Sequence, residues 1–341
     1  MTRQLTPRAW ALPASTIVGA GLFGLLVTNF ASEAFEGLLV TAGIFAILTI
    51  SWNLMGGIAG IFSLGHAAFF GVGAYAAAII QSNTGFPFWI SLLFGGVAAA
   101  VLTIVFLPAF RASGLFLAIL TLAFAEALGI AAGDLFPGGR NGLFVDPLFA
   151  RGSHGWFWTT LAVATAAIVI TWAVRRSNFG LGLQALGSDR VAAASLGMDA
   201  RVAEAQVTLI SGFLAGLAGA IYALSQTFVD PGTVFNVEWS ILPLLMAVLG
   251  GLGSTFGPLV GAVGIFAIDE YVRKLSPSAG GYSAILQGLL LVTLALRFQN
   301  GLAGAAARFL RPVGARSTAR RASGGEIPSA GEGQLGDKVS S

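Results

Sequence analysis

Long apolar runs without charge make up most of this chain, and short segments that carry the charged residues separate them. A helix needs about 20 apolar residues to cross the hydrocarbon core of a bilayer. Runs of about that length or more occur at 12–31, 37–80, 82–110, 155–174, 205–229, 239–268 and 275–296, and another at 114–133 is interrupted only by Glu126. The pattern predicts an all-α fold, a polytopic bundle of membrane helices.

Two of these runs are too long for one membrane helix. The run 37–80 has about twice the required length, and a glycine cluster at 56–60 near its middle predicts a break. The run 239–268 would form a straight helix of about 45 Å, and the glycines and proline within 250–258 predict a second break. The piece 239–251 is then a short or tilted helix. With both breaks the prediction is about ten membrane segments.

The charged residues predict how these segments are oriented. Lys and Arg favour the cytoplasmic side of membrane proteins. With a cytoplasmic N-terminus and ten segments, Arg111, the loop 175–205 and the Arg-rich tail all lie inside. The other loops, near 33–36, 134–154, 230–238 and 273–274, then lie outside. We therefore expect both termini in the cytoplasm, and a retained first helix at 12–31 rather than a cleaved signal peptide.

Composition agrees with a membrane protein. Only 10% of the residues are charged, whereas soluble domains carry about 25%, so the chain cannot cover a water-facing surface. We expect one transmembrane domain over 1–300 and a disordered cytoplasmic tail over 301–341, whose arginines contact anionic membrane lipid. The net charge of +3 lies in loops and tail beside apolar runs. Membrane topology explains this charge, and nucleic-acid binding is not expected.

Several kinds of catalytic site are missing from the sequence. There is no Gly-Lys-Ser or Gly-Lys-Thr, and Lys274 and Lys338 are the only lysines, so no phosphate-binding loop is encoded. The chain has no cysteine, and its two histidines, His66 and His154, lie far apart without clustered carboxylates. We expect no metal, no cofactor and no enzymatic activity. Energy for uphill transport would have to come from an ion gradient or another subunit.

A few polar residues lie within the apolar runs. Glu126 falls near the middle of its run, where a carboxylate costs about 2.5 kcal/mol or more to insert, so it should face protein or water. It is either a station on a translocation path or an interhelical hydrogen-bonding group. Asn53, Ser63 and His66 lie in a glycine-rich segment that could line a polar cavity or simply pack tightly. We take these four residues as candidate substrate-pathway residues.

The loop 175–205 has the composition of a short helical connector. Ser188-Asp189 is a candidate N-cap for a helix over 190–196, and Gly197 is a stop signal. This helix would present Ala192, Ala193 and Ala194 on its surface. It could insert into a groove of a partner protein, or it could lie on the lipid headgroups.

Four segments resemble the permeases of branched-chain amino-acid ABC importers, most closely their M-type subunit. They are 53–78, with its Ser-Leu-Gly-His-Ala-Ala-Phe-Phe-Gly-Val-Gly-Ala-Tyr core, then 114–126, 212–222 and 246–258. The similarity covers roughly 37–298 in the order and spacing of the family. Permeases for urea or short amides are very similar to these proteins. The resemblance implies a type II-like ABC importer permease in a bacterial inner membrane.

The resemblance also implies partners: a second homologous permease, two cytoplasmic ATP-binding subunits that bind the ATP, and a periplasmic (extracytoplasmic) substrate-binding protein. The segment 184–198 matches the cytoplasmic coupling segment that docks on the ATP-binding subunit. Its expected coupling residues are Gln184, Asp189, Arg190, Ala192, Ala193, Leu196 and Gly197. Where such permeases often carry acidic residues beside the Ala-Ala pair, this chain has Arg190 and Ala194, so the resemblance implies the docking surface but not its charge.

We therefore expect the permease subunit of an ATP-driven importer for branched-chain, hydrophobic amino acids. Selectivity would reside mainly in the binding protein, because the permease offers few fixed charges. One alternative is an importer of urea or short amides. An ion-coupled secondary transporter or channel would need more coupling groups at the midplane, and a membrane-embedded enzyme or scaffold would need clustered acids or histidines at one depth.

Overall fold

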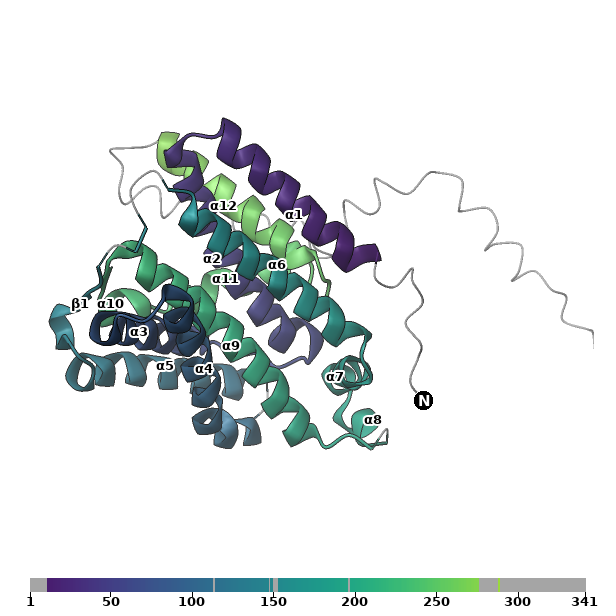
Figure 1. Cartoon of the computed structure of the whole chain (residues 1–341). Coiled ribbons are helices and arrows are strands. Elements are labelled where there is room, and N and C mark those ends of the chain that lie inside the picture. Colours follow the sequence, from purple (N-terminus) through teal and green to yellow (C-terminus); the bar gives the residue numbers. More distant parts are fainter. Residues whose placement is uncertain are drawn as a thin grey trace, which may run out of the picture.

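The computed structural model describes residues 11–112, 114–146, 148–149, 153–195, 197–275 and 288. Helices make up nearly all of this part of the chain, as the hydrophobic pattern predicts (Figure 1). The elements in order are α1 (Ala11–Phe30), α2 (Glu33–Trp52), the π-helix η2 (Asn53–Ile58), α3 (His66–Thr84), α4 (Phe88–Phe106), the 3-10 helix η3 (Leu107–Arg111), α5 (Leu115–Leu135), the 3-10 helix η4 (Gly139–Asn141), β1 (Leu143–Phe144), α6 (Gly155–Arg176), α7 (Asn178–Ser188), α8 (Arg190–Ser195), α9 (Ala200–Gln226), β2 (Phe228–Val229), α10 (Pro231–Val234), α11 (Glu238–Gly250) and α12 (Gly257–Leu275).

Within the described residues, 7 helices are long and apolar enough to cross a membrane. These spans are Leu12–Phe30, Glu33–Ile58, Phe88–Phe110, Leu115–Leu135, Gly155–Arg176, Ala200–Gln226 and Pro231–Gly250. The chain is thus a polytopic helical protein, but the predicted count of about ten is not confirmed. Helix α3 ends in four polar residues, and α12 contains only the shorter apolar stretch Gly257–Ile268. The predicted run 275–296 and the tail 301–341 lie almost entirely outside the described residues.

Both predicted helix breaks are present. Helix α2 runs on as η2 to Ile58, and α3 begins only at His66. Helices α11 and α12 are separated by the loop 251–256, where Gly251 and Gly253 have φ angles of 112° and 69°, a backbone region that favours glycine. Helix α11 has 13 residues and is therefore about 20 Å long. It is the short helix that the glycine pattern predicted.

Helix α9 begins earlier than the apolar run indicated. The prediction started the run at 205, after the charged residues, but α9 starts at Ala200. The side chain of Asp199 accepts hydrogen bonds from the amides of Arg201 and Val202, at 2.9 and 3.3 Å, and so caps the helix. Helix α9 thereby carries Glu204, which is buried, into the bundle.

The centre of the bundle is formed by α3, α4 and α9, which make the most extensive helix contacts in the described chain. Small residues line these contacts. A methyl group built on Gly95 would lie 2.6 Å from the carbonyl oxygen of Gly73, and one built on Gly216 would lie 2.7 Å from that of Gly95. The backbones of the three helices therefore touch, as glycines allow in membrane bundles.

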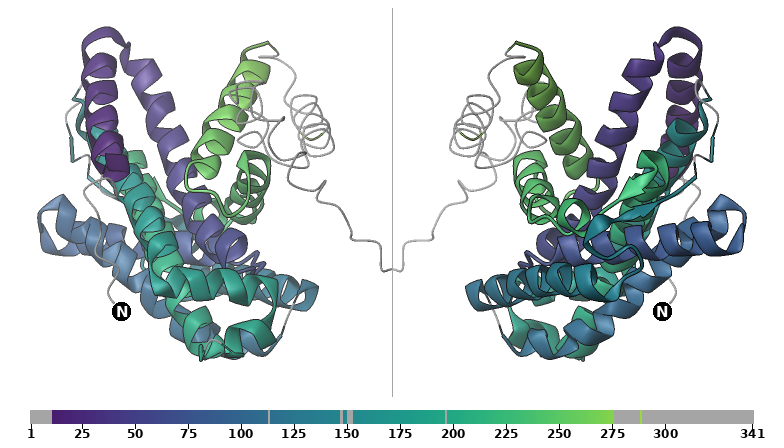
Figure 2. Two further views of the ribbon diagram at one scale, coloured as in Figure 1. Left: turned by 90° about the vertical axis from the view of Figure 1, so that its right-hand side faces the viewer. Right: turned by 90° about the vertical axis from the view of Figure 1, so that its left-hand side faces the viewer.

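The remaining helices surround this centre unevenly. Helix α2 packs on α9 and α6, α1 packs on α6, and α11 and α12 form a pair beside α2. Figure 2 shows that α1 and α12 diverge toward the top of the view, whereas α7 and α8 lie together at the bottom. Helix α5 has few neighbours and leaves much of its surface exposed.

Candidate functional site

Asn53 is fully buried at the start of η2 and ties two distant parts of the chain together. Its Oδ1 accepts a hydrogen bond from the amide of Gly253 at 2.8 Å. Its Nδ2 donates to the carbonyl oxygen of Ser254 at 3.0 Å. Both partners belong to the loop 251–256 between α11 and α12. Asn53 therefore holds that loop against the end of α2.

The segment 59–65, between η2 and α3, folds back on the end of α2. The indole nitrogen of Trp52 donates to the carbonyl oxygen of Ser63 at 2.8 Å, and the amide of Gly65 donates to the Ser63 hydroxyl at 3.1 Å. Ser63 is fully buried. In this structure its polar groups stabilise the break itself.

His66 begins α3 and lies in a buried polar cluster. Its Nε2 is 3.1 Å from the hydroxyl of Ser211 on α9, which in turn donates to the carbonyl oxygen of Ser51 on α2 at 2.9 Å. The hydroxyl of Ser240 accepts from the amide of Ala67 at 2.8 Å, which satisfies a free donor at the start of α3. The Nδ1 of His66 has no hydrogen-bond partner among the described residues.

Glu126 lies apart from these three residues. It is exposed near the middle of α5 and lines a shallow groove of about 300 Å³ together with Gly129, Pro231 and Asn236. No described residue forms a hydrogen bond with its carboxylate. The structure thus gathers Asn53, Ser63 and His66 at the break between α2 and α3, and leaves Glu126 on an outer surface.

The predicted coupling segment forms two helices, α7 and α8, at one end of the bundle. Gln184 is exposed on α7, and its Nε2 donates to the carbonyl oxygen of Gly180 at 3.1 Å. Asp189 joins the two helices with an extended backbone. Gly197 has a φ angle of 76° and follows the end of α8, as the stop signal predicted. Leu196 and the side chains of Arg190 and Ala192 lie outside the described residues.

One expectation for this segment is wrong. Ala193 was expected on the surface of the short helix, but its exposed fraction is 0%. Residues 193 and 194 are about 100° apart around the axis of α8, and Ala194 is exposed. Helix α8 packs against α7 and α9, which covers Ala193. The exposed face of α8 is therefore the one that carries Ala194.

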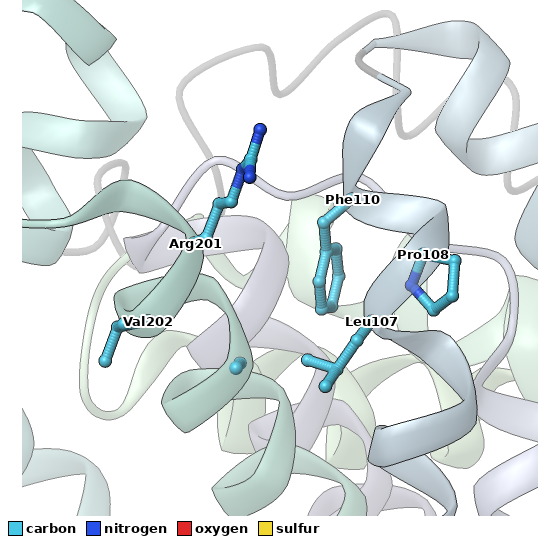
Figure 3. Close-up of a pocket in the computed structure, with 6 residues that line it drawn as sticks. Leu107, Pro108, Phe110, Arg201 and Val202 are labelled. Atoms are coloured by element: carbon cyan, nitrogen blue, oxygen red, sulfur yellow. The ribbon is translucent and has the colours of Figure 1, made fainter.

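The same end of the bundle holds further contacts. Arg175, in the last turn of α6, donates from its guanidinium to the hydroxyl of Thr255 at 3.2 Å. A mostly apolar groove of about 400 Å³ lies between η3 and the start of α9 (Figure 3). In that view Leu107 and Phe110 point toward α9, and Arg201 stands at the rim. The segment 175–205 and η3, which ends at Arg111, therefore lie together. Both were predicted to lie on the cytoplasmic side of the membrane.

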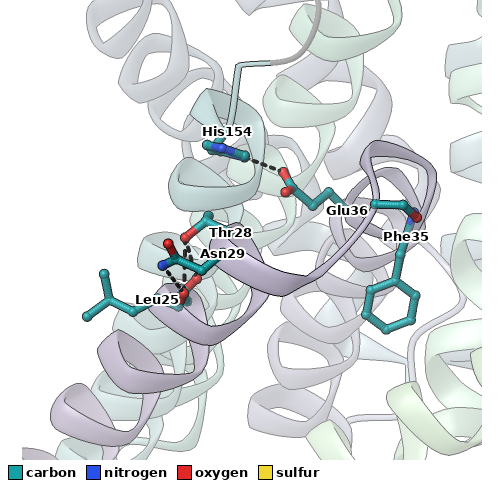
Figure 4. Close-up of polar contacts among 8 residues, drawn as sticks. Leu25, Thr28, Asn29, Phe35, Glu36 and His154 are labelled. Atoms are coloured by element: carbon teal, nitrogen blue, oxygen red, sulfur yellow. Dashed lines mark hydrogen bonds and ion pairs between the residues drawn. The ribbon is translucent and has the colours of Figure 1, made fainter.

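The opposite end is joined by polar and strand contacts. The Nδ1 of His154 is 2.9 Å from the Glu36 carboxylate, which links the start of α6 to that of α2 (Figure 4). Strands β1 and β2 pair antiparallel, with Leu143 opposite Val229. The loops near 33–36, 134–154 and 230–238, which were predicted to share one side of the membrane, therefore lie at the same end of the bundle.

Sequence reasoning missed several of these polar residues. Ser51, Ser211, Ser240 and Ser254 lie in apolar runs or a glycine-rich loop, and all take part in the contacts described above. Small hydroxyl residues inside membrane helices commonly bond across helices. That signal could have marked them as candidates, but not as partners of one another.

Comparison with known proteins supports the predicted resemblance. Residues 34–295 match the family described as branched-chain amino acid transport system / permease component. The high-affinity branched-chain amino acid transport system permease protein LivM of Escherichia coli (strain K12) is 30% identical over 291 residues, which cover 76% of this chain and 67% of that protein. LivM of Salmonella typhimurium gives the same figures.

A more distant relative is the autoinducer 2 import system permease protein LsrC of Salmonella typhi. It is 26% identical over 179 residues, which cover 51% of this chain and 50% of that protein. No solved structure matches the chain. The family match spans well over half of the sequence and most of the described helices. The chain therefore belongs to the family of branched-chain amino acid transport permease components.

Proposed function

We propose that this chain is the permease subunit of an ATP-driven importer of branched-chain, hydrophobic amino acids in a bacterial inner membrane. Two cytoplasmic ATP-binding subunits hydrolyse the ATP, and a periplasmic binding protein delivers the substrate. Family membership and the polytopic helical fold support this proposal. The observation that carries it is the pair α7–α8 at one end of the bundle, of which α7 packs directly on the break between α2 and α3.

Helices α7 and α8 would act as the docking surface for an ATP-binding subunit. They follow α6 and precede α9, so two long membrane helices carry any displacement of this pair into the bundle. Coupling by rigid-body movement requires such a connection between a cytoplasmic element and a gate. The chain itself would need no cofactor, because ATP is bound by its partners.

The exposed face of α5 is the proposed contact with a second, homologous permease subunit. Its large exposed apolar side chains are Leu115, Phe116, Ile119, Leu120, Ile130 and Leu135. Glu126 lies on the same helix and is exposed. A carboxylate facing lipid near the middle of a membrane helix costs about 2.5 kcal/mol or more. A partner subunit or a water-filled path would remove that cost, and we assign Glu126 to the substrate path between the two permeases.

Replacement of Glu126 tests this assignment. Glu126→Leu should lower the rate of transport roughly tenfold, which is within the range by which mutations of residues that link two sites change the coupling between them. The complex should still assemble and hydrolyse ATP. Glu126→Gln, which keeps hydrogen-bonding capacity, should retain more transport. Glu33→Leu, which replaces an exposed acidic residue at the start of α2, serves as the control. Normal transport in Glu126→Leu would remove this residue from the path.

Reconstitution tests the function as a whole. The chain is purified with its second permease and ATP-binding subunits, placed in vesicles, and supplied with binding protein and radiolabelled leucine. Uptake should require ATP on the side of the vesicle membrane that carries the ATP-binding subunits. Collapse of the proton and sodium gradients should leave the uptake rate unchanged. Uptake by the chain alone, driven by an ion gradient, would contradict the proposal. Competition by urea or acetamide but not by isoleucine or valine would instead favour the short-amide importers.

A further inference from the structure

Helix α7 touches the break between α2 and α3 without intervening side chains. A methyl group built on Gly60 would lie 2.8 Å from the Cα of Gly187 on α7. One built on Gly187 would lie 3.1 Å from the carbonyl oxygen of Ile58. Gly60 has a φ angle of 70°, which favours glycine at this position. Because backbone meets backbone, a displacement of α7 reaches residues 58–60 without being absorbed by rotamer changes.

The adjoining segment η2 is a π-helix, which is rare and occurs frequently at functional sites. It comprises Asn53–Ile58 and continues α2 directly. The amide of Ile61 donates to the carbonyl oxygen of Met55 at 3.0 Å, so the chain leaves the helix through an irregular wide turn. The π-helix therefore lies between the contact with α7 at one end and Asn53 at the other.

Asn53 connects this π-helix to the loop 251–256. Its amide accepts from Gly253 at 2.8 Å and donates to Ser254 at 3.0 Å, and the side chain is fully buried. An amide side chain suits this position because its oxygen accepts from a backbone amide while its nitrogen donates to a backbone carbonyl. A methyl group built on Gly57 would lie 2.6 Å from the amide nitrogen of Gly253, so η2 and the loop are also in direct backbone contact.

We infer that Asn53 is a positioning residue for energy coupling and does not contact the substrate. It keeps the loop 251–256, and with it the ends of α11 and α12, moving together with η2 and helix α7. This inference rests on the proposed function, since it assigns the route by which a docked ATP-binding subunit moves the α11–α12 pair. It changes the role of Asn53 from a candidate pathway residue to a mechanical link.

Two variants disturb the link in different ways. Asn53→Leu removes both hydrogen bonds at similar side-chain volume, and Gly57→Ala places a methyl group between η2 and Gly253. In the complete reconstituted complex each should lower amino-acid uptake roughly tenfold relative to wild type, while assembly and the rate of ATP hydrolysis stay near wild type. The controls are Asn29→Leu, whose amide donates to the carbonyl oxygen of Leu25 in the same helix, α1, at 2.7 Å, and Gly21→Ala, where no described atom lies within 4 Å of the added methyl.

A second measurement follows the loop directly. The chain has no cysteine, and Leu252 is exposed on the loop, so Leu252→Cys introduces a single thiol for labelling with a maleimide. In the otherwise wild-type complex the labelling rate should change when a non-hydrolysable ATP analogue binds the partner subunits. In the Asn53→Leu background, with Leu252→Cys, the rate should no longer respond to the analogue.

The outcomes separate this inference from the proposed function. Parallel loss of ATP hydrolysis and uptake, or failure of both variants to accumulate as folded protein, would overturn the inference, because Asn53 would then be a fold anchor. Uptake at the wild-type rate in Asn53→Leu would also overturn it. Absence of ATP-driven uptake in the complete wild-type complex would instead refute the proposed function.

Discussion

The combined exchange Ala194→Trp and Arg190→Glu is expected to abolish co-purification of the ATP-binding subunits with this chain. Ala194 is exposed on α8, within the proposed docking surface. A tryptophan there should prevent close approach of a partner, and the charge reversal at 190 adds an electrostatic change. Interface residues of central importance contribute about 2 kcal/mol or more, and each 1.4 kcal/mol is roughly tenfold in affinity. Affinity purification of the tagged permease measures the loss.

The design depends on which alanine is exposed. Ala193 is fully buried, so a bulky residue there would disrupt the packing of α8 and would not report on docking. The matched control is Ala34→Trp. Ala34 is exposed at the start of α2, whereas α7 contacts the break that follows the other end of this helix. The Ala34 variant should leave the complex intact. If the Ala194 and Arg190 variant still recovers normal amounts of ATP-binding subunit, α8 is not the docking surface.

Gly216→Val is expected to prevent accumulation of the folded protein. The first added carbon would lie 2.7 Å from the carbonyl oxygen of Gly95 and 3.1 Å from the Cα of Gly96. Overpacking usually costs about 1–3 kcal/mol when side chains can adjust. Here the obstacle is the backbone of α4, so α4 and α9 must move apart and the central contact is lost. Fluorescence-detected size exclusion and thermal unfolding in detergent measure the result.

A valine at Gly21 provides the comparison for this prediction. Nothing lies within 4 Å of a methyl group built on Gly21 of α1, and valine is well tolerated in apolar membrane helices. Gly21→Val should therefore accumulate and unfold like the wild type. Equal stability of the Gly216 and Gly21 variants would show that the centre of the bundle is not packed as closely as described.

Much of the helical architecture could be predicted from apolar runs and glycines. The break near 56–60 and the break within 250–258 were both predicted, because runs of that length cannot form single membrane helices and glycine tolerates positive φ angles. The start of α9 could not be predicted from hydropathy. It is set by the N-cap at Asp199. A search for apolar runs places the start later, at 205, because Glu204 and Arg201 interrupt the apolar sequence.

The candidate site was predicted only in part. Asn53, Ser63 and His66 stood out as polar residues in a membrane segment, and they do lie at one break. The partners of Asn53 are about 200 residues away in sequence, and no local pattern identifies such contacts. For α8, 6 residues are too few for a periodic pattern to indicate which alanine is covered. The packing of α8 against α7 and α9 decided that.

The π-helix also determines how the chain tolerates insertions and deletions. A π-helix accommodates one residue more per turn than a regular helix. Removing a single residue from 53–58 would therefore let the chain form an ordinary α-helical turn there, and the residues that follow would keep nearly the same direction around the axis. A deletion in the regular part of α2 has no such outlet and would rotate every later residue by about 100° around the axis, so that Gly60 would no longer face Gly187. Homologous chains that keep this contact should therefore remain constant in length along the regular part of α2 and differ by single residues only within 53–58.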